Sequence, residues 1–172
     1  QPKCVLAAAD IEPEPRDTLV RTFAPSAGQP GGLLHQVDTY ASEEEARTAY
    51  AARVVQLAAC ERHTGWTRTG FTLDALADEA TGILIELQDV VAEYHTIAVS
   101  RTGSRVNIVD ATQPDEAVGM DLLAAPLAAA SARQCVDGGT CPATVAVQLA
   151  VPPPVEPAGW LASVDLPRIT PG

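Results

Sequence analysis

The sequence predicts a domain of the α/β (α+β) class, with a twisted antiparallel sheet of about five to six strands and two main helices packed on one face. Three observations lead to this class. A capped amphipathic helix covers 42–60, a strand-rich meander covers 83–109, and a second helical stretch covers 115–135. A chain of 172 residues can bury one substantial core, so we assign residues 1–151 to one domain and 152–172 to a Pro-rich tail.

The helix over 42–60 has a clear start signal and an apolar stripe. Ser42 is the expected N-cap, and Glu45 completes a capping box in which its carboxylate reaches back to the start of the helix. The glutamates at 43–45 place negative charge at the positive end of the helix dipole. The stripe recurs every three to four residues, which predicts burial against a sheet, and consists of Ala46, Tyr50, Val54 and Leu57.

Two strands are expected before this helix. Residues 18–24 alternate along the chain, and residues 33–40 form a second strand that leads directly into the helix. A segment rich in Gly and Pro separates the two strands and predicts a turn. Further upstream, the Ala-rich residues 5–11 allow one or two helical turns that stop before Pro13.

Four more strands are expected after the helix, at 66–73, 83–88, 94–101 and 105–109. A polar connection over 74–82 separates the first two, and a tight hairpin at 102–104 joins the last two. Alternation gives this meander one oily face and one polar face. The oily face is formed by Ile83, Ile85, Leu87, Ile97, Val99, Val106 and Ile108. The polar face is formed by Glu86, Gln88, Tyr94, Thr96, Ser100, Arg105 and Asn107.

The second helical stretch begins after Asp115 as its cap and runs to about Cys135. Pro126 in its middle removes one backbone hydrogen bond, which predicts either a kink or two abutting helices. Residues 144–151 alternate and are expected to form an edge strand.

The tail is expected to be a polyproline-type linker that contains a weak repeat. Residues 161–167 follow the same pattern as residues 6–11, as if a tandem second domain began there. The alternative is that Trp160 and Leu161 fold back and cover the first domain.

The charge of the chain limits its partners. A net charge of −11 argues against a nucleic-acid partner and against an anionic membrane surface. No apolar run is long enough to span a bilayer, so no membrane insertion by this segment is expected. The first residues contain no signal-peptide pattern, so a signal or anchor was either removed or never present in this segment.

Four cysteines, at positions 4, 60, 135 and 141, show no zinc-site spacing. An even number without metal spacing favours two disulfides in an exported protein over free buried thiols.

The order of these elements, together with spaced residues across about 5–141, resembles the extracellular sensor domain of actinobacterial PknH-like Ser/Thr kinases and their secreted or lipid-anchored relatives. The residues that carry the resemblance are Tyr40, Ser42, Ala46, Tyr50, Arg53, Leu57 and Cys60, then Val99, Gly103, Val106, Ile108, Val109 and Cys135. The chain contains no kinase domain, and its Pro-rich tail departs from the single-domain pattern.

The resemblance implies a domain outside the cytoplasm, secreted or on the extracellular face of the membrane, with helices stapled over the sheet and a cleft for an unidentified ligand. It also implies disulfides between Cys60 and Cys135 and between Cys4 and Cys141. The alternative pairing joins Cys135 to Cys141 and Cys4 to Cys60.

No catalytic or cofactor motif is found, and the three histidines are scattered, so we expect no catalysis, no cofactor and no metal. His95 aligns with the oily face and is expected to be a satisfied core histidine. His35 is expected to be half-buried or on the surface, and His63 to complement the helix dipole. The adjacent acids Asp78 and Glu79, and likewise 115–116, are expected to be solvated.

The polar face of the sheet is the predicted binding surface, because helices on one face would leave the other open. Its candidate binding residues are Tyr40, Arg68, Glu86, Gln88, Tyr94 and Asn107. The alternative is an ordinary solvated face. The predicted function is therefore a ligand-sensing or binding module for a small molecule or cell-wall fragment. A structural cell-envelope interaction protein and an unrecognised hydrolase are the alternatives.

Overall fold

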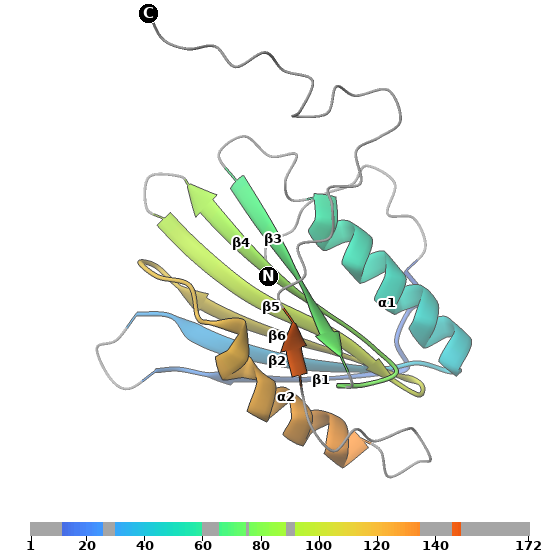
Figure 1. Cartoon of the computed structure of the whole chain (residues 1–172). Helices are drawn as coiled ribbons and strands as arrows, with labels where there is room; N and C mark the ends of the chain where they lie inside the picture. Colours follow the sequence, from blue (N-terminus) through green and yellow to red (C-terminus); the bar gives the residue numbers. More distant parts are fainter. Residues whose placement is uncertain are drawn as a thin grey trace, which may run out of the picture.

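The structure is a computed structural model that describes residues 12–25, 30–59, 66–74, 76–88, 92–134 and 146–148. These ranges form β1 (Asp17–Phe23), β2 (Gly32–Thr39), α1 (Glu43–Ala58), β3 (Trp66–Asp74), β4 (Glu79–Gln88), β5 (Ala92–Thr102), β6 (Arg105–Gln113), α2 (Met120–Gln134) and β7 (Ala146–Gln148) (Figure 1).

The strands form one antiparallel sheet in the order β1-β2-β6-β5-β4-β3-β7. β1 and β2 are one hairpin, and β3 to β6 are a meander whose last strand lies beside β2. The predicted antiparallel sheet with two helices is therefore confirmed. The short β7 is an edge strand within the predicted range 144–151.

β4 and β6 extend furthest beyond the ranges that the sequence pattern predicts. β4 begins at Glu79, inside the expected polar connection, and β6 continues to Gln113. Both pair with β5, which has 11 residues and lies between them. β5 can form backbone hydrogen bonds along its whole length. Polar residues such as Thr81 and Thr112 therefore adopt strand conformation because they pair with β5.

One face of the sheet packs against α1 and is called the α1 face. Its main core cluster confirms the predicted oily face and the predicted helix stripe, and contains Tyr40, Ala46, Ala49, Tyr50, Leu57, Ala59, Ile83, Ile85, Ile97, Val99, Val106 and Ile108, with Val54 and Leu87 partly buried beside it. The predicted N-cap forms, because Glu45 N donates to Ser42 Oγ (3.2 Å). The Glu45 carboxylate reaches back as predicted, but it accepts from Ala41 N (3.0 Å), one residue before the donor of a standard capping box.

The opposite side of the sheet, the α2 face, packs against α2 (Figure 1). Its core cluster contains Leu73, Leu76, Ala98, Val109, Ala111, Met120, Leu123 and Leu127. Ala98 belongs to this cluster, whereas its neighbours Ile97 and Val99 on β5 belong to the cluster under α1. Because successive residues of a strand point to opposite faces, α1 and α2 lie on opposite faces of the sheet. The prediction that both helices pack on one face is wrong. β5 and β6 carry small or apolar residues on both faces, as strands covered on both sides do.

α2 starts later and is more continuous than predicted. It begins at Met120 rather than after Asp115, and Pro126 lies within a single helix, so two abutting helices are not formed. Pro126 and Leu122 are exposed. The carbonyl that loses its hydrogen-bond partner to the proline is therefore on the outer side of the helix, where water can replace the bond.

Several predictions fall on residues outside the described ranges. These are the helical turns at 5–11, the role of His63, the tail at 152–172 with its repeat, and every pairing of Cys4, Cys60, Cys135 and Cys141. Neither helix in the described part of the chain is long and apolar enough to cross a membrane.

Candidate functional site

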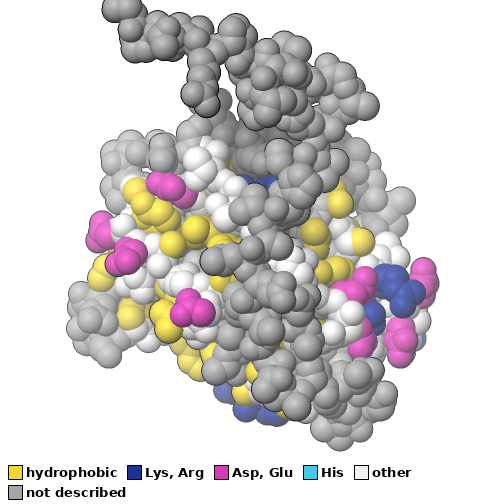
Figure 2. All heavy atoms as spheres, in the orientation of Figure 1, with side chains coloured by type: hydrophobic (Ala, Val, Ile, Leu, Met, Phe, Trp, Pro, Cys, Tyr) yellow, Lys and Arg dark blue, Asp and Glu magenta, His cyan; other side chains and the backbone are white. Residues whose placement is uncertain are grey.

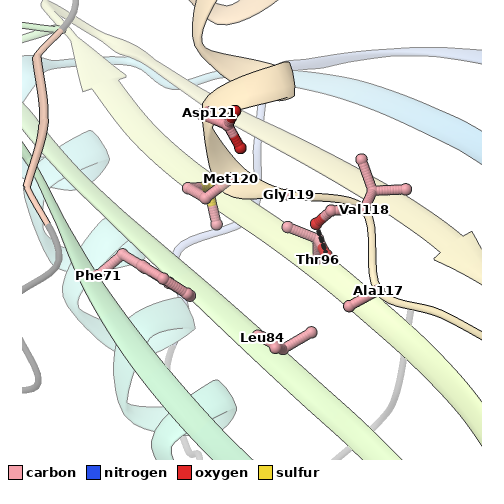
Figure 3. A pocket seen from close by; sticks show the side chains of 8 residues that line it. All are labelled: Phe71, Leu84, Thr96, Ala117, Val118, Gly119, Met120 and Asp121. Carbon is pink, nitrogen blue, oxygen red and sulfur yellow. Dashed lines mark hydrogen bonds between the residues drawn. The ribbon is translucent and has the colours of Figure 1, made fainter.

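A pocket of about 340 Å³ lies on the α2 face, between the segment that leads into α2 and side chains of β3, β4 and β5 (Figure 3). The sheet provides its floor and the start of α2 its wall. The lining consists of Phe71, Leu84, Thr96, Ala117, Val118, Gly119, Met120 and Asp121. A volume of this size falls within the range of small-molecule sites, and the lining is mostly apolar, as such sites are.

Two contacts fix the segment that forms the wall. Thr96 Oγ1 donates to the carbonyl oxygen of Val118 at 2.6 Å, drawn as a dashed line in Figure 3. Met120 is buried against Gly82, where an added Cβ would lie 2.6 Å from Met120 Cε. The start of α2 is therefore anchored to the sheet on both sides of Gly119.

The pocket has a polar neighbour on the same face. Leu84 pairs with Thr96 across β4 and β5, and the next residues on this face, Glu86 and Tyr94, pair with each other. Tyr94 Oη donates to Glu86 Oε1 and Thr67 Oγ1 donates to Glu86 Oε2, both at 3.3 Å. A hydroxyl and a carboxylate therefore lie one step along the strands from the apolar floor, about 7 Å away.

This end of the site is acidic. The negative charge of Glu86 raises the pKa of Tyr94, with smaller contributions from burial and from Asp115, so the phenol keeps its proton and remains a donor. Asp121 adds a further carboxylate at the pocket wall. Figure 2 shows acidic side chains beside apolar surface on this side of the molecule. An anionic ligand group would be repelled here.

The six predicted binding residues do not form one site. Glu86 and Tyr94 are in contact beside the pocket. Gln88 follows Glu86 on β4, and its side chain is outside the described part of the structure. Asn107 is buried, and its amide exchanges hydrogen bonds with the side chain of Gln134 at the end of α2.

Tyr40 and Arg68 lie on the α1 face, so the prediction that they project from the polar face is wrong. Arg68 pairs with Ile85, whose side chain is in the α1 core. Tyr40 is buried in the same core, and its hydroxyl donates to Glu12 Oε1 at 3.4 Å. Burial, with the charge of Glu12 next in importance, raises the pKa of Tyr40.

The polar face is also not open as predicted. Its alternation is correct, but Thr96, Ser100 and Asn107 are each only 1% exposed. The pocket residues were not predicted. The sequence contains one indication of the pocket, in Leu84 and Phe71. Both are apolar residues on the face that alternation assigns as polar.

His95 is a buried histidine with partners, as predicted. Its Nδ1 lies 2.9 Å from Asp110 Oδ1, and its Nε2 lies 2.9 Å from Glu93 Oε1. In a catalytic triad the second ring nitrogen contacts the nucleophile. Here a carboxylate is bonded to it instead, so this cluster is not arranged for nucleophilic catalysis.

The expectation that Asp78 and Glu79 are merely solvated acids is wrong. Arg101, whose side chain is 5% exposed, donates to Glu79 Oε2 at 2.5 Å and to Asp78 Oδ2 at 3.1 Å. His35 is half-buried and Asp115 is exposed, as predicted. Within the described residues no group of three or more His, Cys, Asp or Glu could hold a metal ion.

Comparisons with family models, with curated proteins and with solved structures find no match to this chain. The function is therefore inferred from the geometry of the site.

Proposed function

We propose that this chain is an extracytoplasmic ligand-binding or ligand-sensing module without catalytic activity, and that the pocket at the start of α2 is its binding site. The observation that carries the proposal is the position of the hydrogen-bonded pair Glu86 and Tyr94, which lies on the same sheet face as the pocket floor at Leu84 and Thr96 and one step further along β4 and β5. Apolar volume and polar groups that converge at one end are the usual features of a small-molecule site.

The chemistry of the lining and of the polar groups beside the pocket defines the ligand class. The apolar part of a ligand would leave water and contact apolar side chains of the lining, among them Phe71, Leu84 and Met120. Thr67, Glu86 and Tyr94 fit a hydroxyl or amide group that exchanges hydrogen bonds with them. Carboxylates at Glu86 and Asp121 disfavour an anionic end. The expected ligand is thus a small amphiphile with an uncharged polar end.

The proposal that the chain is not an enzyme is supported by the arrangement of its buried titratable groups. His95 is bonded to carboxylates at both nitrogens, and Arg101 is bonded to Asp78 and Glu79. These groups therefore satisfy one another and lie on the α1 face, away from the pocket. The extracytoplasmic location, and membership of the PknH-like sensor family, are supported by the cysteine count and by the order of elements on which the resemblance rests.

A fluorescence titration with N-phenyl-1-naphthylamine, an uncharged apolar probe, tests the site. We expect the probe to bind with enhanced emission, and Ala117→Phe to abolish the enhancement by filling the pocket. Ala132→Phe is the matched control, because Ala132 is exposed on α2 and does not line the pocket. Octyl glucoside, below its micelle concentration, should displace the probe at lower concentration than octanoate does.

Two results would overturn the proposal: no binding of the probe, or equal binding by Ala117→Phe and Ala132→Phe. Should Ala117→Phe fail to fold, amide chemical shifts of the wild-type chain provide the second test. Addition of the probe should then move the resonances of Leu84, Thr96 and Gly119 more than those of α1.

A further inference from the structure

β1 is an edge strand of the sheet and is exposed along its whole length. All seven residues of β1 are exposed, and three of them are large and apolar: Leu19 (64%), Val20 (56%) and Phe23 (47%). On its inner side β1 pairs with β2, and no described strand lies on its outer side. Within the part of the chain that the structure describes, its outward-facing N–H and C=O groups therefore have no strand to pair with.

Several of the usual protections of an edge strand are missing from β1. Residues 17–23 contain no proline or lysine, and the pairing with β2 is unbroken over all seven positions, so no bulge twists the edge away. The two charged residues, Asp17 and Arg21, have opposite signs. This strand is consequently suited to pairing with a strand of matching charge pattern.

We infer that the partner of this edge is β1 of a second copy of the chain, paired antiparallel about a two-fold axis at Leu19. In this register Asp17 of each copy lies opposite Arg21 of the other, and the two Leu19 side chains are in contact on the α2 face. Directly opposite side chains of an antiparallel pair interact, and opposite charges in that position are favourable. The contact is isologous and closes as a dimer.

The neighbouring registers are less favourable. An axis at Arg21 places the two guanidinium groups opposite each other, and like charges in that position are destabilising. An axis at Val20 places Asp17 opposite Phe23 and Leu19 opposite Arg21, so neither charge is paired. A register shifted by one residue would place side chains from the α1 face of one copy opposite side chains from the α2 face of the other. The charge pattern therefore selects the Leu19 register.

Sedimentation velocity over a concentration series tests the dimer. The wild-type chain is expected to reach twice the monomer mass, and Leu19→Lys to raise the dissociation constant by roughly tenfold or more, because it places two like charges on the axis. Leu122→Lys is the matched control, since Leu122 is similarly exposed (67%) but lies on α2. Its dissociation constant should equal that of the wild type.

A charge exchange tests the register. Asp17→Arg alone and Arg21→Asp alone should each weaken the dimer, and the two together should restore it, because the exchanged pair is again opposite in sign. Circular dichroism checks that each variant is folded.

The inference is overturned if the wild-type chain stays monomeric, as it would if another segment of the chain or a different protein covers β1. It is overturned equally if Leu122→Lys weakens the dimer as much as Leu19→Lys. If the double exchange fails to restore association that both single variants weaken, the Leu19 register is wrong.

Discussion

His95 Nδ1 lies 2.9 Å from Asp110 Oδ1 on the α1 face of the sheet, and the opposite ring nitrogen lies 2.9 Å from Glu93 Oε1. His95 and Asp110 are both buried, whereas the Glu93 side chain is 49% exposed. Thr112 Oγ1 lies 3.3 Å from the same Nδ1. Since each ring nitrogen faces a carboxylate, the doubly protonated imidazolium is the form that satisfies both contacts.

This arrangement predicts a stability that falls as pH rises. Burial lowers the pKa of His95, but the hydrogen bonds and charges of Asp110 and Glu93 outweigh it, and the net shift is upward. Because the pKa is higher in the folded state, protonated His95 stabilises the fold. This stabilisation is fully present below the unfolded-state pKa of about 6.5 and is lost as the pH rises through the folded-state pKa. Urea unfolding near pH 6 and near pH 9 should show a larger stability loss for the wild type than for His95→Gln.

The same shift can be measured directly by an NMR titration of the His95 ring. Asp110→Asn should lower the pKa of His95, because burial then outweighs the remaining charge of Glu93. An unchanged pKa in that variant, or equal pH dependence of the wild type and His95→Gln, would show that the contact with Asp110 does not favour the charged ring.

A second prediction concerns the buried guanidinium of Arg101. Arg101→Ala removes the partner of Glu79 and Asp78 and should lower the free energy of unfolding by about 2–4 kcal/mol, since breaking a buried ion pair is strongly destabilising. Arg47→Ala is the control. Arg47 pairs with Glu44 on the helix surface, where both are exposed, and its loss should cost about 0.5 kcal/mol or less. Equal losses in urea denaturation would contradict the assigned role.

The sequence was sufficient where local patterns determine structure. The Ser42 cap, the apolar stripe of α1 and the alternation of β5 and β6 depend on neighbours within a few residues, and all three were predicted correctly. Strand ends were harder to predict, because Glu79 is in strand through pairing with β5, and Thr112 through pairing with both β5 and β2.

The side chosen by α2 was not predictable from its own pattern. The helix presents Leu123 and Leu127, which could pack on either face of a sheet. Ala98 and Ala111 determine the side on which α2 packs, because they are small and apolar. They lie on the same face as the polar residues Glu86 and Tyr94, so this face is only partly polar. The binding site was missed for the same reason, since the pocket depends on where α2 begins and on which face it covers.

A third prediction compares adjacent glycines at the start of β2. Gly31 has φ 103°, and a Cβ there would lie 2.5 Å from the backbone oxygen of Thr112. Gly31→Ala should therefore destabilise the protein by about 2 kcal/mol or more. At Gly32 the nearest atom would be the Phe23 carbonyl oxygen at 3.5 Å, an ordinary contact. Thermal unfolding of Gly32→Ala should resemble the wild type, and a similar loss at both positions would contradict this account.

The last prediction joins the packing of Gly82 to the pocket. A Cβ on Gly82 would lie 2.6 Å from Met120 Cε and 2.9 Å from Met120 Sδ, so Gly82→Ala forces the flexible end of Met120 to move. Phe71 Cβ, at 3.2 Å, limits movement on that side. The open space beside Met120 is the pocket it lines, so the side chain should enter it.

Gly82→Ala is therefore expected to cost about 1 kcal/mol in stability and to weaken binding of N-phenyl-1-naphthylamine several-fold. Met120→Ala removes the atoms that the new Cβ displaces. In the Met120→Ala background, Gly82→Ala should have little further effect on probe binding, so the two changes should not be additive. Full additivity of the binding losses would show that Gly82 affects the site by a route other than Met120.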